Sequence, residues 1–121
     1  MIAAADINIT KVEQSKLNDI NLRNIRFGKY FTDHMLEMDY TNGEWKQAEI
    51  KPYQLLLLSP SLASFYYGQA IFEGIKAYKT AEGKAFIFRP IDNFKRFNMS
   101  QKECRCHGCP KKYLWRVCVN W

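Results

Sequence analysis

Cysteine is absent from the first 103 of the 121 residues, and all four cysteines follow in the remainder: Cys104, Cys106, Cys109 and Cys118. The absence excludes a disulfide framework for most of the chain and is typical of proteins from a reducing compartment. The abrupt change indicates that the end of the chain differs in kind from what precedes it.

Long apolar runs are also missing. The longest, residues 55–58, is far shorter than the roughly 20 residues of a membrane-spanning helix. Residues 1–16 have neither the basic region nor the apolar stretch of a secretory signal. We therefore expect a cytoplasmic protein with no membrane association.

Positive charge is not spread over the chain. Residues 1–100 carry 13 Lys/Arg against 11 Asp/Glu, whereas residues 101–121 carry five against one. Most of the formal net charge of +6 belongs to a short tail, so the basic balance does not predict a nucleic-acid partner. A composition of 47% hydrophobic and 15% aromatic residues is typical of a globular protein.

Apolar alternation predicts strands in the first half of the chain. A short strand is expected at 6–12, and a β-hairpin is expected from 31–41 and 44–52. Asn42-Gly43 joins the two hairpin strands, because both residues tolerate positive φ.

The second half predicts a mixture of helix and hairpin. Residues 62–72 have near-helical spacing, and a second hairpin is expected from 75–80 and 84–89. Asp92 is the expected N-cap of a short helix through 93–99. The residues therefore predict an α/β fold.

Few residues in positions 1–100 suggest a catalytic or ligand-binding role. Residues 1–100 contain no metal-ligand spacing, no glycine-rich phosphate loop and no Ser/His/Asp arrangement. Arg96 is a candidate anion ligand, because a guanidinium matches phosphate or carboxylate geometry; the alternative is a solvated surface arginine. Tyr66, Tyr67 and Phe72 surround a glycine, although most such aromatic clusters are simply core. His34 is expected to be structural or exposed.

Two sequence motifs are more informative than these single residues. Y-G-Q-A-I-F-E-G-I-K-A-Y at 67–78 is followed by F-R-P-x-x-N-x-x-R at 88–96. With these strings, residues 7–100 resemble the N-terminal region of branched-chain amino acid aminotransferases, pyridoxal-phosphate enzymes of fold type IV. The resemblance implies an incomplete small domain of a two-domain protein, α/β (α+β), with a mixed sheet and flanking helices.

The resemblance also implies roles for particular residues. Arg96 corresponds to the arginine that binds the phosphate of pyridoxal 5'-phosphate. Tyr67 and Phe72 correspond to residues that line the pocket for the branched aliphatic side chain, and Phe27 lines the same pocket. An apolar wall suits leucine, isoleucine or valine, and a dianionic phosphate needs fixed donors.

The implied reaction is transamination between a branched-chain amino acid and 2-oxoglutarate, small-molecule substrates of amino-acid biosynthesis. In the family a lysine holds the cofactor as a Schiff base, and none of Lys76, Lys79, Lys84 or Lys95 matches its position. No catalytic residue is therefore assigned, and the 121-residue polypeptide is expected to be inactive alone and poorly soluble. Full-length relatives are expected to be homo-oligomers.

The tail departs from the resemblance after Ser100. Restoring one base there permits a family-like reading of residues 101–121, so we interpret this segment as a frameshifted, unstructured tail appended to a partial domain at 1–100. The alternative is a small non-enzymatic module whose Cys/His tail binds zinc through Cys106-x-x-Cys109. Only one proper ligand pair is present, which disfavours a structural zinc site, so no metal ligand is assigned.

Overall fold

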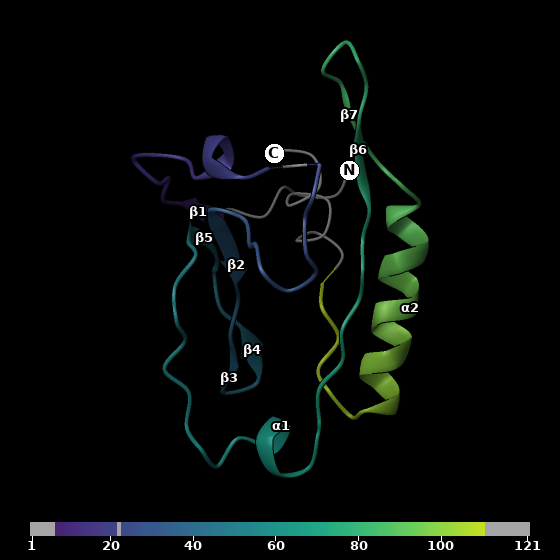
Figure 1. Ribbon diagram of the computed structural model, residues 1–121. Helices are drawn as coiled ribbons and strands as arrows, with labels where there is room; N and C mark the ends of the chain where they lie inside the picture. The colour runs from purple at the N-terminus through teal and green to yellow at the C-terminus, as the bar shows by residue number, and fades with distance from the viewer. Residues whose placement is uncertain (1–6, 22, 111–121) are drawn as a thin grey trace. The chain divides into compact units, whose positions relative to one another are not determined.

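The structure is a computed structural model that describes residues 7–21 and 23–110 (Figure 1). The chain divides into two compact units at residues 57 and 58, and each unit is described by itself. The described residues are 7–21 and 23–57 in the N-terminal unit and 58–110 in the C-terminal unit. No helix of the described residues has the length and apolar character needed to cross a membrane.

A mixed three-stranded sheet organises the N-terminal unit (Figure 1). Its central strand is β5 (Ala48–Pro52), which pairs in parallel with β1 (Ile7–Ile9) and antiparallel with β2 (His34–Glu37). Ile50 lies opposite Ile9 on one side and Leu36 on the other. The sheet confirms the α/β fold class with a mixed sheet.

A tight turn extends the antiparallel pairing. Strands β3 (Tyr40–Thr41) and β4 (Glu44–Trp45) pair around Asn42 and Gly43, whose φ angles are 54° and 84°. Positive φ at both positions suits a type I′ turn, so the predicted hairpin is confirmed. Its strands are less continuous than expected, because residues 38–39 and 46–47 interrupt the ladder and one backbone bond, from Lys46 N–H to the Asp39 carbonyl at 2.8 Å, joins them.

The buried apolar core of the described residues is very small. It consists of Ala48 and Ile50, which alternate with exposed Glu49 along β5. His34 secures the unit in a different way, because its Nε2 accepts a hydrogen bond from the Val12 backbone N–H at 3.1 Å. This contact is consistent with the structural role expected for His34.

A short 3₁₀ helix, η1 (Leu17–Asp19), lies in the segment between β1 and β2. Asp33 anchors this segment: its carboxylate accepts hydrogen bonds from the Ser15 hydroxyl at 2.6 Å and from the Lys16 N–H at 3.0 Å. The Ser15 bond is the main cause that lowers the pKa of Asp33. The otherwise irregular segment is thereby fixed next to β2.

The C-terminal unit begins with a helix much shorter than predicted. The helix α1 covers only Ala63–Tyr66, so the expectation of helical structure over 62–72 was wrong beyond its first turn. Gly68 has φ 60°, a left-handed conformation in which the chain leaves the helix. The second hairpin is confirmed: β6 (Ala77–Lys79) pairs antiparallel with β7 (Ala85–Ile87).

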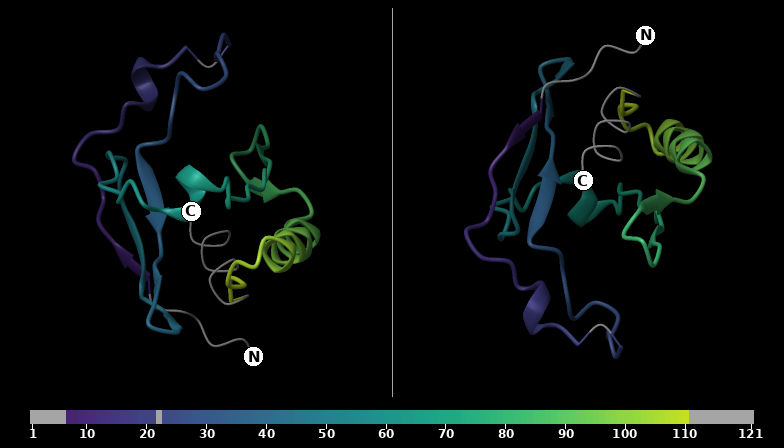
Figure 2. Two further views of the ribbon diagram at one scale, coloured as in Figure 1. Left: turned by 90° about the horizontal axis from the view of Figure 1, so that it is seen from below. Right: turned by 90° about the horizontal axis from the view of Figure 1, so that it is seen from above.

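The long helix of this unit is α2 (Pro90–Glu103), seen nearly along its axis in Figure 2. Pro90 occupies the first turn, where its missing N–H costs nothing. The N-cap is Arg89 with φ 46°, so the prediction of Asp92 as N-cap was wrong. Asp92 instead lies in the first turn and accepts a hydrogen bond from Arg89 Nε at 2.7 Å.

The helix α2 continues three residues past Ser100, into the segment that sequence analysis assigned to the tail. Residues 104–110 then fold back on the helix end. The Gln101 carbonyl accepts a hydrogen bond from the Cys106 N–H at 2.8 Å, and the Gln101 side chain accepts one from the Cys109 N–H at 2.9 Å. Residues 111–121, including Cys118, lie outside the described residues.

Candidate functional site

Arg96, the candidate phosphate ligand, lies in the middle of α2 and points its guanidinium at Glu73 in the preceding segment. Its Nε donates to Glu73 Oε2 at 2.7 Å, and its Nη2 donates to Glu73 Oε1. The pair is bidentate, the geometry that best fixes a guanidinium. Helix and segment are thus joined across 23 positions of sequence.

The two partners differ in exposure. Only 10% of the Glu73 side-chain surface is exposed, against 64% for Arg96. The Glu73 side chain is therefore largely covered by its neighbours, whereas most of the Arg96 side chain is exposed. The hydrogen bonds from Arg96 lower the pKa of Glu73 below its ordinary value of 4.5, and the same bonds raise the pKa of Arg96. Both groups are therefore ionised at neutral pH.

Asn93 completes the junction. It lies one turn before Arg96 on the same helix face. Its Nδ2 donates to the Gly74 carbonyl at 2.7 Å and lies 3.4 Å from Glu73 Oε1. The Gly74 N–H donates to the same Glu73 oxygen at 3.0 Å. We call Glu73, Gly74, Asn93 and Arg96 the clasp.

The clasp uses only one edge of the guanidinium. Glu73 occupies the edge formed by Nε and Nη2. A guanidinium carries five N–H groups, so three remain, two of which point along the edge formed by Nη1 and Nη2. These donors, on an exposed side chain, fit a phosphate or carboxylate as one of its ligands.

Tyr67 and Phe72, the expected wall of the substrate pocket, are both strongly exposed, at 87% and 96%. They lie on the same segment as Glu73, on either side of residues 68–71. Phe72 lines a hollow of about 400 Å³ whose remaining walls come from the same segment and the end of α2: Ala70, Ile71, Met99, Ser100, Glu103 and Cys104. Tyr67 does not line this hollow.

Phe27, the third expected pocket residue, belongs to the N-terminal unit and is fully exposed. It lies next to Gly28, which has φ 73°, in a turn between η1 and β2. None of the described residues of its own unit covers it.

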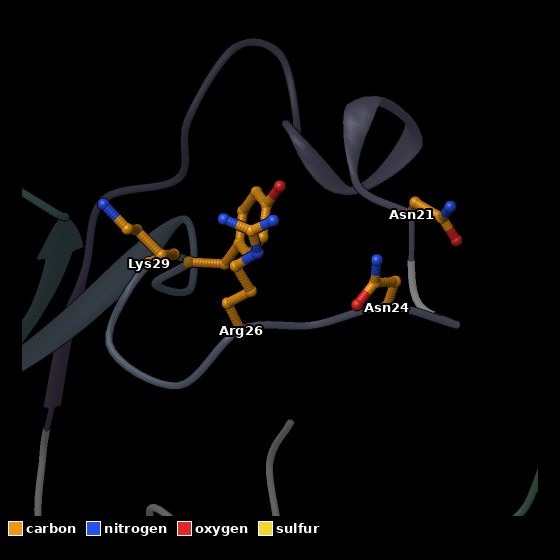
Figure 3. Close-up of a pocket in the computed structure, with 5 residues that line it drawn as sticks. Asn21, Asn24, Arg26 and Lys29 are labelled. Atoms are coloured by element: carbon orange, nitrogen blue, oxygen red, sulfur yellow. The ribbon is translucent and has the colours of Figure 1, made fainter.

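The same turn region borders a wide hollow of about 460 Å³ (Figure 3). Two amides, two cations and one phenol line it: Asn21, Asn24, Arg26, Lys29 and Tyr30. In Figure 3 the Lys29 side chain extends away from both asparagines. It also extends away from the Arg26 guanidinium, so the two cations do not converge as an anion site would require (Figure 3).

The cysteines that the structure describes form no disulfide. Among residues 7–21 and 23–110, no group of three or more His, Cys, Asp or Glu side chains is arranged to hold a metal ion. Cys118, the fourth candidate thiolate, lies outside that part of the chain. The described residues thus provide no support for the zinc alternative.

Sequence reasoning found Arg96 but missed its partners. Glu73 and Asn93 both lie inside the strings 67–78 and 88–96 that drew attention. A carboxylate beside a glycine and an arginine 23 residues later carry no local periodicity, so their pairing depends on tertiary structure. The available signal was only that both polar residues lie within these two strings.

Comparison with curated proteins gives consistent matches, although no protein-family model matches the chain. The chain is 53% identical over 75 residues to "Branched-chain-amino-acid transaminase 1" of Bacillus subtilis, a match covering 61% of the chain and 21% of the relative. It is 44% identical over 103 residues to the cytosolic branched-chain-amino-acid aminotransferase of Saccharomyces cerevisiae (84% and 27%). A Mycolicibacterium smegmatis aminotransferase matches at 44% over 92 residues (75% and 25%). The matches thus span about a fifth to a quarter of the relatives' length.

Proposed function

We infer that this chain is a segment of the branched-chain-amino-acid aminotransferase family, and we propose that it contributes the cofactor-phosphate ligand and part of the substrate wall to such an enzyme. The support is homology at 44–53% identity over most of the chain. The proposed reaction moves an amino group between leucine, isoleucine or valine and 2-oxoglutarate.

The observation that supports the proposal is the orientation and exposure of the Arg96 side chain. Its guanidinium is held on one edge by Glu73 and is 64% exposed. A dianionic phosphate accepts two parallel N–H bonds from such a group, and these charge-assisted bonds are roughly twice as strong as neutral ones. We propose that Arg96 binds the phosphate of pyridoxal 5'-phosphate, which supplies the electron sink of transamination when bound.

Tyr67, Phe72 and Phe27 are the proposed wall of the substrate side-chain pocket. All three expose nearly their entire surface within the described chain. Covering an exposed aromatic surface with an aliphatic group lowers the free energy of the complex. The pocket would exclude water and select by shape, so that one methylene changes affinity by about 1–3 kcal/mol.

The cellular setting is proposed on the same basis. We expect a cytoplasmic, homo-oligomeric enzyme; the yeast relative is named cytosolic. We also propose that residues 101–121 are read in a shifted frame and do not belong to the family. Sequencing the DNA around codons 99–103 tests this, and an intact frame there would contradict it.

A chimera tests the proposed function. The matched segment of the Bacillus subtilis relative would be replaced by its counterpart from this chain, and transamination of leucine and 2-oxoglutarate would be measured. We expect activity within about tenfold of the parent enzyme, because 53% of the aligned residues are already identical.

The matched variant is Arg96→Gln within the same chimera, with Lys95→Gln as a control that removes one neighbouring charge. We expect the first to weaken retention of the cofactor and the second to leave it unchanged. A folded chimera that binds no cofactor, or one in which Arg96→Gln retains it fully, would refute the proposal.

A further inference from the structure

The clasp holds Arg96 in a way that a simple surface ion pair does not. Glu73 receives two donors from Arg96, one from the Gly74 N–H and a longer contact from Asn93. Both carboxylate oxygens are therefore engaged. A carboxylate with so many donors is held in one rotamer, and so is the guanidinium that binds it.

Burial shows which partner orients the other. The Glu73 side chain is 10% exposed and is fixed by backbone on its own segment, whereas Arg96 is 64% exposed. An exposed arginine normally samples many rotamers, and burial of a long side chain costs up to about 2 kcal/mol of conformational entropy. Glu73 removes this freedom before any ligand arrives.

Asn93 adds a second attachment from α2. Its amide donates to the Gly74 carbonyl at 2.7 Å, next to the peptide whose N–H binds Glu73. The segment carrying Glu73 is thereby tied to the helix carrying Arg96 at two points. Helix and segment are bound as one body, which keeps the guanidinium edge in a constant direction.

We propose that Glu73, assisted by Asn93, is a positioning residue that fixes the Nε/Nη2 edge of Arg96 and presents the Nη1/Nη2 edge to a phosphate monoester. This inference rests on the proposed function, because it deepens the role given there to Arg96. Glu73 itself does not touch the ligand.

The alternative role for Glu73 is to oppose phosphate binding at Arg96. A carboxylate next to Arg96 neutralises its charge and repels a dianion, so removing Glu73 would then strengthen phosphate binding. The two roles predict opposite signs for the same substitution. Affinity measured on one variant therefore separates them.

The experiment compares pyridoxine phosphate with pyridoxine, which differ by the phosphate and lack an aldehyde that would react with lysines. Binding to the full 121-residue chain is measured by NMR titration, and the ratio of the two affinities is the phosphate preference. The Arg96 Nε–H resonance, assigned by its loss in Arg96→Lys, reports the orientation of the guanidinium.

We expect wild type to prefer the phosphate ester and to show a protected Nε–H signal. Arg96→Gln should abolish the preference. Glu73→Gln should lower it about tenfold and Asn93→Ala less, with loss of the Nε–H signal in the first; tenfold corresponds to about 1.4 kcal/mol, within the range for a bond to a charged group. Glu82→Gln, the same change in the hairpin turn of the same unit, is the matched control and should match wild type.

Other outcomes overturn one proposal or both. Loss of preference in Arg96→Gln with an equal or higher preference in Glu73→Gln refutes positioning and leaves the role of Arg96 standing. An absent preference in wild type, or an unchanged one in Arg96→Gln, refutes both. If Glu73→Gln does not fold, Glu73→Asp decides: it keeps the charge but shortens the reach, so an unaltered phosphate preference refutes positioning.

Discussion

The side chain of Gln101 accepts a hydrogen bond from the Cys109 backbone N–H at 2.9 Å, so α2 holds the loop that follows it. Gln101 is only 5% exposed, and its carbonyl also accepts the Cys106 N–H. A buried glutamine is uncommon unless it is bonded in this way. Gln101 thus binds the loop 104–110 at two points.

Gln101→Ala should release this loop. An N–H left without its partner costs about 1–3 kcal/mol if it stays buried, so the loop is expected to open to water instead. Burial raises the pKa of the Cys109 thiol, which slows its alkylation at pH 8, and opening should accelerate it. Mass spectrometry after iodoacetamide treatment measures the rate. Lys102→Ala is the control, and equal Cys109 rates in the two variants would contradict the role of Gln101.

Gly43→Ala should destabilise the N-terminal unit by about 1 kcal/mol, because φ at this position is 84° and a Cβ is strained there. Asn42→Gly removes a side chain at φ 54° and should have little effect. Tyr40 and Trp45 face each other across the hairpin with ring centroids 5.2 Å apart, so near-ultraviolet dichroism during urea unfolding reports the change. A Gly43→Ala variant with unchanged free energy of unfolding would exclude the proposed turn geometry.

Ile50→Ala should cost about 2 kcal/mol or more, in the lower part of the range for buried isoleucine because the surrounding core is small. Ile50 is 5% exposed and lies between Ile9 and Leu36 in the sheet register. Ile9→Ala is the comparison: Ile9 is 54% exposed, so this variant should lose much less stability. Similar losses for both, measured by chemical denaturation, would place the core elsewhere.

Acid should open the clasp only below the ordinary titration range of glutamate. Arg96 lowers the pKa of Glu73 in the folded chain, so the clasp stabilises the fold above the ordinary value of 4.5 and loses this effect as pH falls through the folded value. We expect the Arg96 Nε–H signal to persist at pH 4.5 and to fade further down, and Glu73→Gln to abolish this dependence. A midpoint above 4.5 would show that the pair does not form in solution.

The isolated polypeptide should associate with itself. Besides Tyr67 and Phe72, the described residues expose Leu55 and Leu57 at 95% and 103%. Exposed apolar patches drive association. Sedimentation velocity should show mass increasing with concentration, and Leu55→Gln with Leu57→Gln should reduce it, whereas Lys51→Gln should not. A monomer at all concentrations would contradict the expectation.

Local patterns predicted the hairpins, because Asn42-Gly43 and the turn before Lys84 determine backbone direction within a few residues. The mixed sheet fits the fold class implied by the resemblance, yet no pattern specified that β1 pairs in parallel with β5. The helix at 62–72 was overestimated, because apolar spacing outweighed the left-handed preference of Gly68. The N-cap was predicted three positions too late, at Asp92, because Arg89 with positive φ is an unusual N-cap. The resemblance gave Arg96 a role, but the partners of its guanidinium depend on contacts distant in sequence.

Double pairing of β5 has a consequence for the order in which the N-terminal unit opens. Strands β1 and β2 each have one partner in the sheet, while β5 has two. An edge strand can detach in a local fluctuation, which frees only those amides of residues 48–51 that bond to it, and the remaining amides stay protected until the other neighbour separates. Complete hydrogen exchange along β5 therefore requires both neighbours to open and reports the lifetime of the whole sheet, whereas exchange in β1 or β2 reports the opening of one edge.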